Sequence, residues 1–375
     1  MSVEPRIAGP GKALEVRTAG DEAVSAVLAE ALEQDGKVDR ATHGFHTYPA
    51  GLHPDAARIL VGAFPGAVHD PFCGGGTVLV EGILQGRKTT GGDLSSIALL
   101  VASARTADPV LASPLRADAR RIADQAKLKK DVEVPEELRE WYEPHVAQEI
   151  GRMRDAIPDA RPEVQRLLWA VLSSIVVKAS FRESDTSNTR VPHHRPPGST
   201  AILFHKKARE LGRRIETLPV QRDVRIKRAD ARADAPSGPL GLILTSPPYP
   251  GVYDYLPLQQ LRNLWLGIDP GEAFAQEIGS RRSFRAHRHE AVTQWREDTA
   301  RWIERQSKAL DPSGALIVVV GDGLVAGKTV DALSPTAEAL RAAGLEIQAR
   351  ASVDREDHAR QRIRTEHLVC ARPSK

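Results

Sequence analysis

Residues 67–93, AVHDPFCGGGTVLVEGILQGRKTTGGD, decide the fold of this chain. The apolar start at 67–72 predicts a short strand that breaks into the glycines Gly74 to Gly76. Helical spacing over 77–85 follows, and 88–92 predicts a second strand. A strand, a crossover helix and a second strand form a βαβ unit, so this stretch predicts a parallel sheet.

The glycines and the acid after the second strand point to a nucleoside ligand. Glycines directly after a buried strand let the backbone pass close to a bound molecule, and the next helix N-terminus offers free N–H groups. Asp93, about 20 residues further on, suits hydrogen bonds to ribose hydroxyls. A plain tight turn would explain the glycines alone, but the preceding strand and Asp93 favour an adenosine-containing cofactor.

Two helices are expected before this stretch, and strands and helices alternate after it, with one interruption at 110–220. That block predicts helices without a convincing strand run, and it includes a long polar loop at 182–199. We expect a Rossmann-like α/β sheet with a mostly helical insertion, divided as 1–108, 109–220 and 221–375. The expected elements outside the first stretch are helices at 21–36, 54–63, 95–106, 114–128, 135–156, 162–182, 200–217, 293–310 and 334–343, and strands at 222–229, 240–244, 315–320, 345–353 and 366–371.

A second chemical stretch, Thr245-Ser246-Pro247-Pro248-Tyr249, follows the apolar strand expected at 240–244. Two prolines stiffen the backbone and remove two N–H donors. An exocyclic amino group of a base can donate to Ser246 Oγ and the Pro247 carbonyl while the Tyr249 ring stacks on the base, worth roughly 1–3 kcal/mol. A Pro-Pro turn with an incidental tyrosine is the plain alternative, which the position after a buried strand disfavours.

Together these stretches resemble S-adenosylmethionine-dependent DNA amino-methyltransferases. DPFCGGGTVLVEGILQGRKTTGGDLS (70–95) is similar to their motifs I and II, FHTYPAGLHP (45–54) to motif X, and Thr-Ser-Pro-Pro-Tyr to motif IV. The family often has Asn-Pro after the ribose-binding acid, where this chain has Ser95-Ser96. The resemblance covers about 45–105 and 222–371. It implies a class I methyltransferase sheet with S-adenosyl-L-methionine as cofactor. The block 109–220 lies before motif III, a departure from the family's usual plans, and we infer that it supplies target recognition.

The resemblance also assigns roles to single residues. Motif III usually holds an acid near the adenine; Asp230 fits that place, and Asp118 is its rival because both lie in the string RADAR. Tyr253 and Tyr255 are expected to line a base pocket, with core packing as the alternative. Catalysis falls to Ser246, Pro247, Pro248 and Tyr249. Cofactor binding falls to Asp70, Phe72, Gly74, Gly76, Thr77, Asp93, Asp230, His46 and Tyr48.

The implied activity is site-specific methylation of an exocyclic amino group in double-stranded DNA, with the target base flipped out of the helix. Cytosine N4 is favoured, because the Ser-Pro-Pro-Tyr form is commonest among enzymes that act on it. An adenine-N6 DNA or an RNA amino-methyltransferase would share every motif. A protein-glutamine or small-molecule methyltransferase and a non-catalytic DNA-binding regulator also stay open, as do the oligomeric state and a restriction endonuclease partner.

The overall charge of +3 neither demands nor forbids nucleic acid, so the distribution of charge matters. Residues 178–232 hold 14 Lys and Arg against 6 Asp and Glu, and 281–289 (RRSFRAHRH) is a second basic stretch. Both are expected to contact phosphates, although a solvated face is the plain alternative. Ser180 and Ser184 are further candidates to reach the target. The predicted DNA contacts are Arg182, Asp185, Arg190, Arg195, Arg281 and Arg282, with Tyr253 in the base pocket.

Composition excludes several classes of protein. The 375 residues include two cysteines, which excludes a disulfide framework and a zinc site made of cysteines alone. No metal is expected, since His193-His194 lacks metal-ligand spacing. No apolar run reaches the ~18 residues that span a bilayer, and the N-terminus lacks signal-peptide features. We therefore expect a cytoplasmic protein that associates with the nucleoid through DNA.

Overall fold

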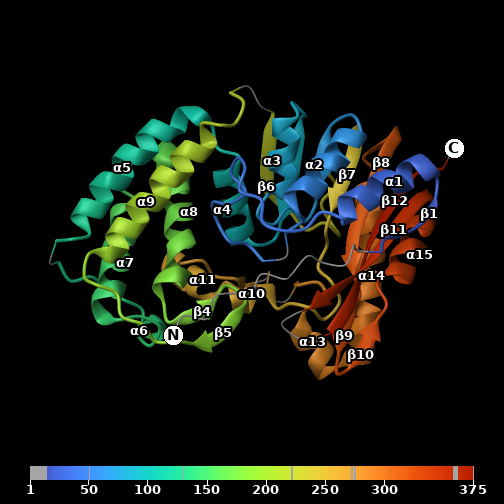
Figure 1. Ribbon diagram of the computed structural model, residues 1–375. Coiled ribbons are helices and arrows are strands. Elements are labelled where there is room, and N and C mark those ends of the chain that lie inside the picture. Colours follow the sequence, from blue (N-terminus) through green and yellow to red (C-terminus); the bar gives the residue numbers. More distant parts are fainter. Residues whose placement is uncertain are drawn as a thin grey trace.

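A computed structural model describes residues 15–49, 51–128, 130–220, 223–271, 273, 276–357 and 362–374. A central sheet carries helices on its faces, and a block of long helices lies beside it (Figure 1). The strands are β1 (Arg17–Gly20), β2 (Val68–Asp70), β3 (Thr89–Asp93), β4 (Arg182–Ser184), β5 (Ser187–Arg190), β6 (Val224–Arg228), β7 (Leu240–Thr245), β8 (Leu310–Gly321), β9 (Gly323–Val325), β10 (Lys328–Val330), β11 (Leu345–Asp357) and β12 (Arg362–Pro373). The helices are α1 (Glu22–Leu32), α2 (Pro54–Ala63), α3 (Thr77–Leu84), α4 (Ser96–Arg105), the 3₁₀ turn η1 (Pro109–Leu111), α5 (Ala112–Gln125), α6 (Glu136–Arg139), α7 (Pro144–Ala156), α8 (Pro162–Ala179), α9 (Ser199–Ile215), α10 (Tyr255–Leu258), α11 (Gln260–Leu266), α13 (Arg281–Ala286), α14 (Arg288–Ser307) and α15 (Leu333–Ala342).

The eight strands of the main sheet follow the order β1-β11-β12-β8-β7-β2-β3-β6. Pairing is parallel from β8 through to β6, and antiparallel from β8 through β12 and β11 to β1. The chain runs from β2 through β3 to β6 and then returns to β7, on the other side of β2. Ligands of α/β proteins bind outside the carboxyl ends of the strands at such a reversal. The expected Rossmann-like class I sheet is confirmed.

β8 shows why this sheet is central. Its apolar run alternates between the two faces, as successive strand residues must. Leu316 and Val318 pack into the core under α14 and α15, whereas Ile317 and Val319 pack into the core under α1 and α2. A strand covered on both faces therefore appears in the sequence as an unbroken apolar run.

The helical block shares one apolar core with the adjacent layer of the sheet. α5, α7, α8 and α9 pack together, and their core continues through Leu100 and Ala104 of α4 and Trp265 of α11. Tyr142 lies inside the block and donates its hydroxyl to the Val176 carbonyl at 2.8 Å. The division into 1–108, 109–220 and 221–375 therefore stays a proposal. It divides the chain by position in the sequence, and the helical block does not have a core of its own.

The structure differs from the sequence expectations mainly in short polar strands. Helix 162–182 ends at Ala179, and the polar loop after it contains the hairpin β4–β5, whose residues RES and SNTR lack apolar alternation. The helix expected at 135–156 is two helices, because Pro144 starts α7 and a proline is tolerated in a first helical turn. The sequence predicts no helix or strand in residues 1–20, yet Arg17–Gly20 forms β1; residues 1–14 lie outside the described part.

In the described part of the chain, every helix is too short or too polar to cross a membrane.

Candidate active site

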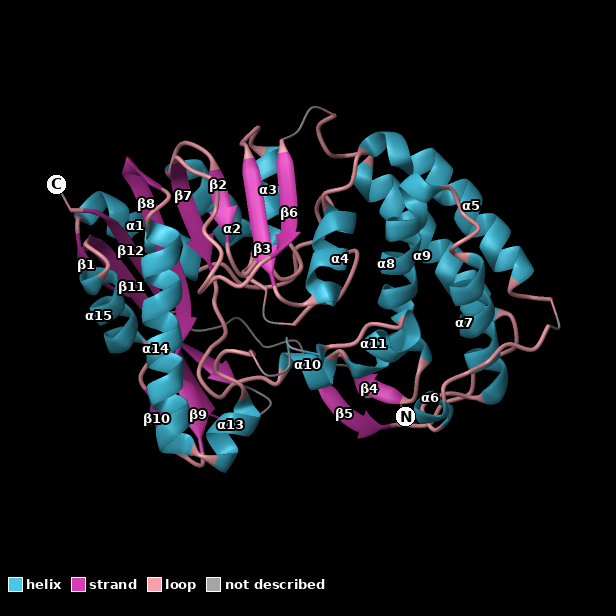
Figure 2. Cartoon of the chain, turned by 180° about the vertical axis from the view of Figure 1, so that it is seen from behind, coloured by secondary structure: helices cyan, strands magenta, loops and turns pink. Residues whose placement is uncertain are grey.

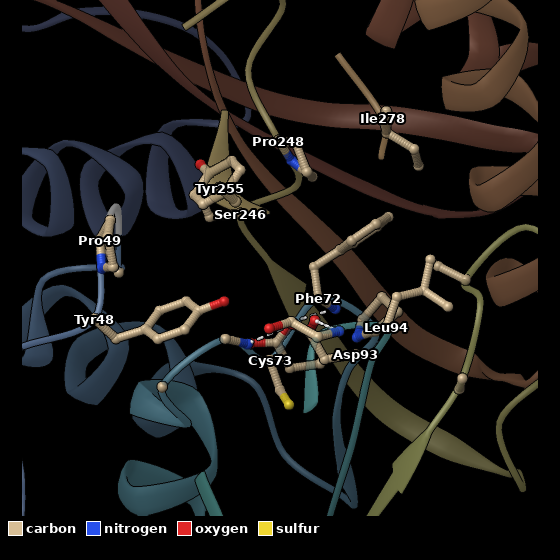
Figure 3. A pocket seen from close by; sticks show the side chains of 18 of the residues that line it. Tyr48, Pro49, Phe72, Cys73, Asp93, Leu94, Ser246, Pro248, Tyr255 and Ile278 are labelled. Atoms are coloured by element: carbon tan, nitrogen blue, oxygen red, sulfur yellow. Dashed lines mark hydrogen bonds between the residues drawn. The ribbon is translucent and has the colours of Figure 1, made fainter. Parts of the chain in front are cut away.

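A pocket opens at the carboxyl ends of β2, β3 and β7, where the strand order reverses (Figure 3). About 1010 Å³ is empty there, part of it open solvent, which suffices for a nucleoside-sized ligand. Two stretches far apart in sequence meet in its wall, the glycine loop and the Ser-Pro-Pro-Tyr turn. The predicted site residues that line it are Tyr48, Asp70, Phe72, Gly74, Thr77, Asp93, Asp230, Ser246 and Pro248.

Asp93 ends β3 inside this pocket. Its Oδ2 accepts a hydrogen bond from Gly74 N at 2.9 Å, and its Oδ1 accepts one from Ser95 N at 2.8 Å. Burial raises the pKa of this carboxyl to about 6, because desolvation disfavours the charged form. Each carboxylate oxygen keeps a second lone pair, so Asp93 can hold the glycine loop and accept from two ligand hydroxyls.

Asp70 joins the two motifs at the end of β2. Its Oδ1 accepts from Thr245 Oγ1 at 2.7 Å and from Phe72 N at 3.1 Å. Burial raises the pKa of Asp70 to about 7. A cationic ligand nearby would favour the ionised form of this carboxyl, so the pocket suits a ligand with positive charge. Sequence reasoning quoted Thr245 but gave it no role.

Gly74 and Gly76 of the loop have different reasons to be glycine. Gly74 (φ +47°) lines the pocket, and a Cβ there would lie 3.2 Å from Tyr48 Cε1. Gly76 (φ +81°) is absent from the lining; a Cβ there would lie 3.0 Å from the Cα of Ala102, so Gly76 lets α3 pack closely on α4. The expected cofactor contact of Gly76 is therefore replaced by a packing role.

The segment before the glycine loop contributes Tyr48 and not His46. His46 is buried, with Nε2 3.0 Å from Ser173 Oγ of α8 and Nδ1 2.9 Å from the Thr47 carbonyl. Burial holds the pKa of His46 well below its usual value. Figure 3 shows the Tyr48 side chain reaching into the pocket. His46 thus links this segment to the helical block, which corrects its expected cofactor contact.

Arg105 is a site-building residue that sequence reasoning missed. Its buried guanidinium donates to the Gly75 carbonyl at 3.0 Å and to the carbonyls of His43 and His46 at 2.9 and 2.6 Å. These bonds clamp the glycine loop to the segment that carries Tyr48. An arginine in an alanine-rich helix gives no sequence signal for such a role.

A second cavity, with about 660 Å³ of empty space, shares part of its wall with the first. Ser246 and Tyr255 line both cavities. Tyr249 and Tyr253 line the second one, and its use as a base pocket stays a prediction. Sequence reasoning did not anticipate its charged wall, which consists of Arg355, Arg364 and Glu366.

The Ser-Pro-Pro-Tyr turn is held in place by its own side chains and by α14. Tyr249 Oη donates to Glu366 Oε1 at 2.9 Å, and Ser246 Oγ lies 3.5 Å from Tyr249 Oη. Burial, followed by the charge of Glu366, raises the pKa of Tyr249 well above its usual value, so the phenol stays neutral. The Pro248 carbonyl accepts from Trp295 Nε1 at 3.3 Å. The Pro247 ring is buried and absent from both linings, so its side chain contributes only the shape of the turn.

Asp230 is the better of the two candidate acids near the adenine position. It lines the first pocket, and its carboxylate is held by Arg232 Nε at 3.0 Å from Oδ1. Asp118 lies in α5, where its Oδ2 accepts from Arg161 N at 3.0 Å. The rival acid therefore belongs to the helical block.

Part of the expected DNA-contacting set is buried, which corrects that expectation. Arg182 donates to the carbonyls of Ser187 at 2.6 Å and Leu258 at 2.9 Å and is 5% exposed. Ser180 is buried and donates its hydroxyl to the Val177 carbonyl at 2.7 Å. Asp185 is paired with the buried guanidinium of Arg262. These side chains join the β4–β5 hairpin to the chain after the Ser-Pro-Pro-Tyr turn.

The remaining basic candidates lie in two separate places, and Arg190 is exposed whereas Arg195, Arg281 and Arg282 are half-buried. Arg190 is exposed on β5, with its guanidinium 5.4 Å from the centre of the Phe181 ring. Arg195 donates its backbone N–H to Glu143 at 2.8 Å, while Arg281 and Arg282 begin α13, where Arg282 pairs with Glu277 at 2.9 Å. The β4–β5 hairpin and α13 lie toward the edge of the sheet at which the strands β3 and β6 end (Figure 2).

The basic stretch 178–232 does not form one patch. The end of α9 leads into β6, so it lies at the amino edge of the parallel strands, opposite the pocket. There Arg214 pairs with Asp39 at 2.6 Å and with Glu210 at 3.0 Å. Arg222, which the sequence count includes, lies outside the described residues.

The described residues contain no cluster of three or more His, Cys, Asp or Glu side chains that could hold a metal ion.

No family model matches the chain. One curated relative, the type II methyltransferase M.MvaI of Kocuria varians, is 33% identical over 71 residues, which span 17% of this chain and 16% of that protein. The chain therefore matches only about a sixth of the length of this relative.

Solved structures with a similar arrangement include TrmN from Thermus thermophilus (TM-score 0.31, 12% identity, 86% of this chain and 48% of that one). Others are a SAM-dependent methyltransferase from Methanosarcina mazei (0.35, 8%, 88% and 98%) and the rRNA methyltransferase aviRa from Streptomyces viridochromogenes (0.33, 12%, 89% and 90%). Because these scores lie below 0.5, the Rossmann-like fold of this chain rests on its own strand order.

Proposed function

We propose that the protein transfers a methyl group from S-adenosyl-L-methionine to an exocyclic amino group of a DNA base, with cytosine N4 as the first candidate. The observation that carries this proposal is the position of Ser246 in the wall shared by two cavities. One cavity has the features of a nucleoside cofactor site, and the other is rich in tyrosine. A group transferred between two ligands needs such a shared wall.

The first pocket fits the proposed cofactor. Asp93 has free lone pairs for ribose hydroxyls, Asp70 favours a cationic ligand, and Gly74 leaves the loop without side-chain bulk beside Tyr48. When bound, S-adenosylmethionine supplies the methyl group: the amino nitrogen lone pair forms the N–C bond, the S–C bond breaks, and an amino proton leaves to solvent.

The second pocket and its wall orient the acceptor. Ser246 Oγ can accept a hydrogen bond from the target amino group, and so can the Pro247 carbonyl, for which no partner is found among the described residues. Tyr249 offers its ring for stacking while Glu366 holds its hydroxyl at 2.9 Å. Two acceptors that fix both amino protons leave the nitrogen lone pair directed at the methyl group. Orientation of this kind is a large part of catalysis in transfer reactions.

Fewer observations support DNA as the substrate than support methyl transfer as the reaction. It is supported by the segment shared with a type II methyltransferase, by the Ser-Pro-Pro-Tyr form of the turn, and by the exposed Arg190 on the pocket edge of the molecule. An adenine-N6 or RNA substrate would use the same two pockets, so the product identifies the substrate.

Purified protein with methyl-labelled S-adenosylmethionine and unmethylated DNA or RNA tests the proposal. We expect label in DNA, and nucleoside analysis should return N4-methylcytosine. Ser246→Ala should lose activity while it keeps cofactor affinity, which separates loss of chemistry from loss of folding. Label in neither nucleic acid would refute the proposal, and N6-methyladenine would correct the base.

A further inference from the structure

The charged wall of the second pocket has an unusual charge arrangement. In the β11–β12 hairpin, Arg355 and Arg364 are directly opposite each other, and both line the cavity. Like charges in cross-strand positions are destabilising. Glu366 also lines the cavity and is the carboxylate nearest in sequence to Arg364 on β12.

The two arginines are fixed to different degrees. Arg355 donates through Nε to Glu366 at 2.7 Å and through Nη2 to the Leu32 carbonyl at 2.7 Å. Glu366 accepts from Tyr249 with its other oxygen, so Arg355, Glu366 and Tyr249 form one fixed unit. The Arg364 guanidinium lies instead over the Tyr249 ring, with its central carbon 5.6 Å from the ring centre.

The position of Arg364 coincides with the place that the proposed function gives to the base. On another side, the ring packs against Gly321, where a Cβ would lie 2.6 Å from Tyr249 Cε2. Because Arg364 and Tyr249 both line the second cavity, the side of the ring under Arg364 is the side that we assign to the base. A base stacked on this side displaces the guanidinium from the ring toward the edge of the base.

On this basis we propose that Arg364 selects cytosine by donating two hydrogen bonds to its N3 and O2 atoms; the inference rests on the proposed function. Cytosine presents two adjacent acceptors, N3 and O2, next to its amino group. Adenine presents N1 and then a C–H, and thymine presents an N–H. A planar guanidinium donates in parallel to two acceptors, which a lysine ammonium does not do.

The test uses the full-length protein with Arg364→Met, which removes the donors, and Arg364→Lys, which keeps the charge. Arg372→Met is the matched control, because Arg372 also lies on β12 over an aromatic ring, that of Phe64, at 5.9 Å and does not line the cavity. Methyl transfer is measured on unmethylated genomic DNA with nucleoside analysis. Sequencing of the modified DNA then locates the target position. Kinetics are next measured on synthetic duplexes that carry cytosine or adenine at that position.

We expect Arg364→Met to lower kcat/KM on the cytosine duplex by roughly 10- to 100-fold, the range for loss of a bidentate contact to a base. The preference for cytosine over adenine should shrink by the same factor, Arg364→Lys should not restore it, and S-adenosylmethionine affinity should stay within twofold. Arg372→Met should match the wild type.

Three results would overturn the inference. If Arg364→Met lost the same activity on the cytosine and adenine duplexes, and Arg364→Lys restored that activity, Arg364 would bind a phosphate and not the base. Unchanged specificity in Arg364→Met would mean that it only covers the ring. N6-methyladenine as the wild-type product would remove cytosine selection while methyl transfer to DNA stands, whereas absence of any transfer would remove both proposals.

Discussion

The two pockets that meet at Ser246 are built from opposite kinds of sequence and carry opposite charge. The first takes most of its wall from residues between 48 and 95, around the glycine loop, and its acids are Asp70, Asp93, Asp230 and Glu277. The second is assembled from segments near both ends of the chain and has two arginines against Glu366. The proposed cofactor site can thus be encoded locally, while the proposed acceptor site depends on the completed sheet.

The largest effect should come from the locally encoded pocket. Asp93→Ala removes the acceptors for ribose and the anchor of Gly74, and hydrogen bonds to charged groups are worth about 1.5–3 kcal/mol each. We expect cofactor Kd to rise roughly 100-fold or more, measured by calorimetry. Tyr249→Ala, on the other side of Ser246, is the control and should bind cofactor like the wild type. A change below threefold in Asp93→Ala would break the assignment of this pocket.

Substitutions in the second pocket should lower the rate of methyl transfer and leave cofactor affinity unchanged. Loss of base stacking in Tyr249→Ala should lower kcat/KM by about 10- to 100-fold. Tyr249→Phe keeps the ring and loses only the hydrogen bond to Glu366, so its loss should stay under about tenfold. Steady-state kinetics with DNA, combined with calorimetry of the cofactor, measure both. Equal losses in the two variants would show that the hydroxyl matters and that stacking does not.

The pH dependence should distinguish the pockets more finely. Ionised Asp93, with its pKa raised by burial to about 6, accepts from the ligand, so cofactor affinity should fall about tenfold per pH unit below that pKa. Asp93→Asn should flatten this profile. In the absence of cofactor the sign reverses: a raised folded-state pKa makes Asp93 lower the stability as pH rises from about 4 to about 6. The Tm of Asp93→Asn should therefore gain on the wild type over that range, and a constant difference would contradict the shift.

The smallest expected effect separates the two candidate acids. Asp230→Ala should weaken cofactor binding by less than about tenfold, since it removes one acceptor from the pocket wall. Asp118→Ala should leave affinity unchanged and cost about 1 kcal/mol of stability, because Arg161 N loses its partner. Cofactor titrations and thermal unfolding of both variants measure this. The opposite pattern would restore Asp118 as the site residue.

The same contrast explains how far the sequence could predict this molecule. The strand–glycine–helix–strand pattern placed β2, α3 and β3 closely, and Asp93 and Tyr48 line the pocket as expected, because local chemistry fixes them. His46 and Arg182 look equally available in the sequence, yet both are buried against partners far away in the chain. Their orientation depends on tertiary packing that no local pattern records.

Arg105 and Arg364 show two further limits. Arg105 lies in a helix whose pattern indicates only packing, although its guanidinium clamps three backbone carbonyls. Arg364 and Arg355 lie in long polar ends of β11 and β12, beyond the strands expected at 345–353 and 366–371. Apolar alternation therefore finds Glu366 and Leu368 of the cavity wall, which lie in the strand expected at 366–371, but it does not find the two arginines.

The strand order also has a consequence for how this protein folds during synthesis on the ribosome. Asp70 and Thr245 touch in the finished sheet, yet 175 positions separate them. β2 therefore emerges long before β7, its neighbour, and long-range pairing of this kind is slow and leaves strand edges exposed. The helices α5, α7, α8 and α9 between them pack mostly against one another and can condense first, beside α4. We expect the helical block to act as an early folding unit that waits for the rest of the sheet, so both pockets come into existence together, late in synthesis.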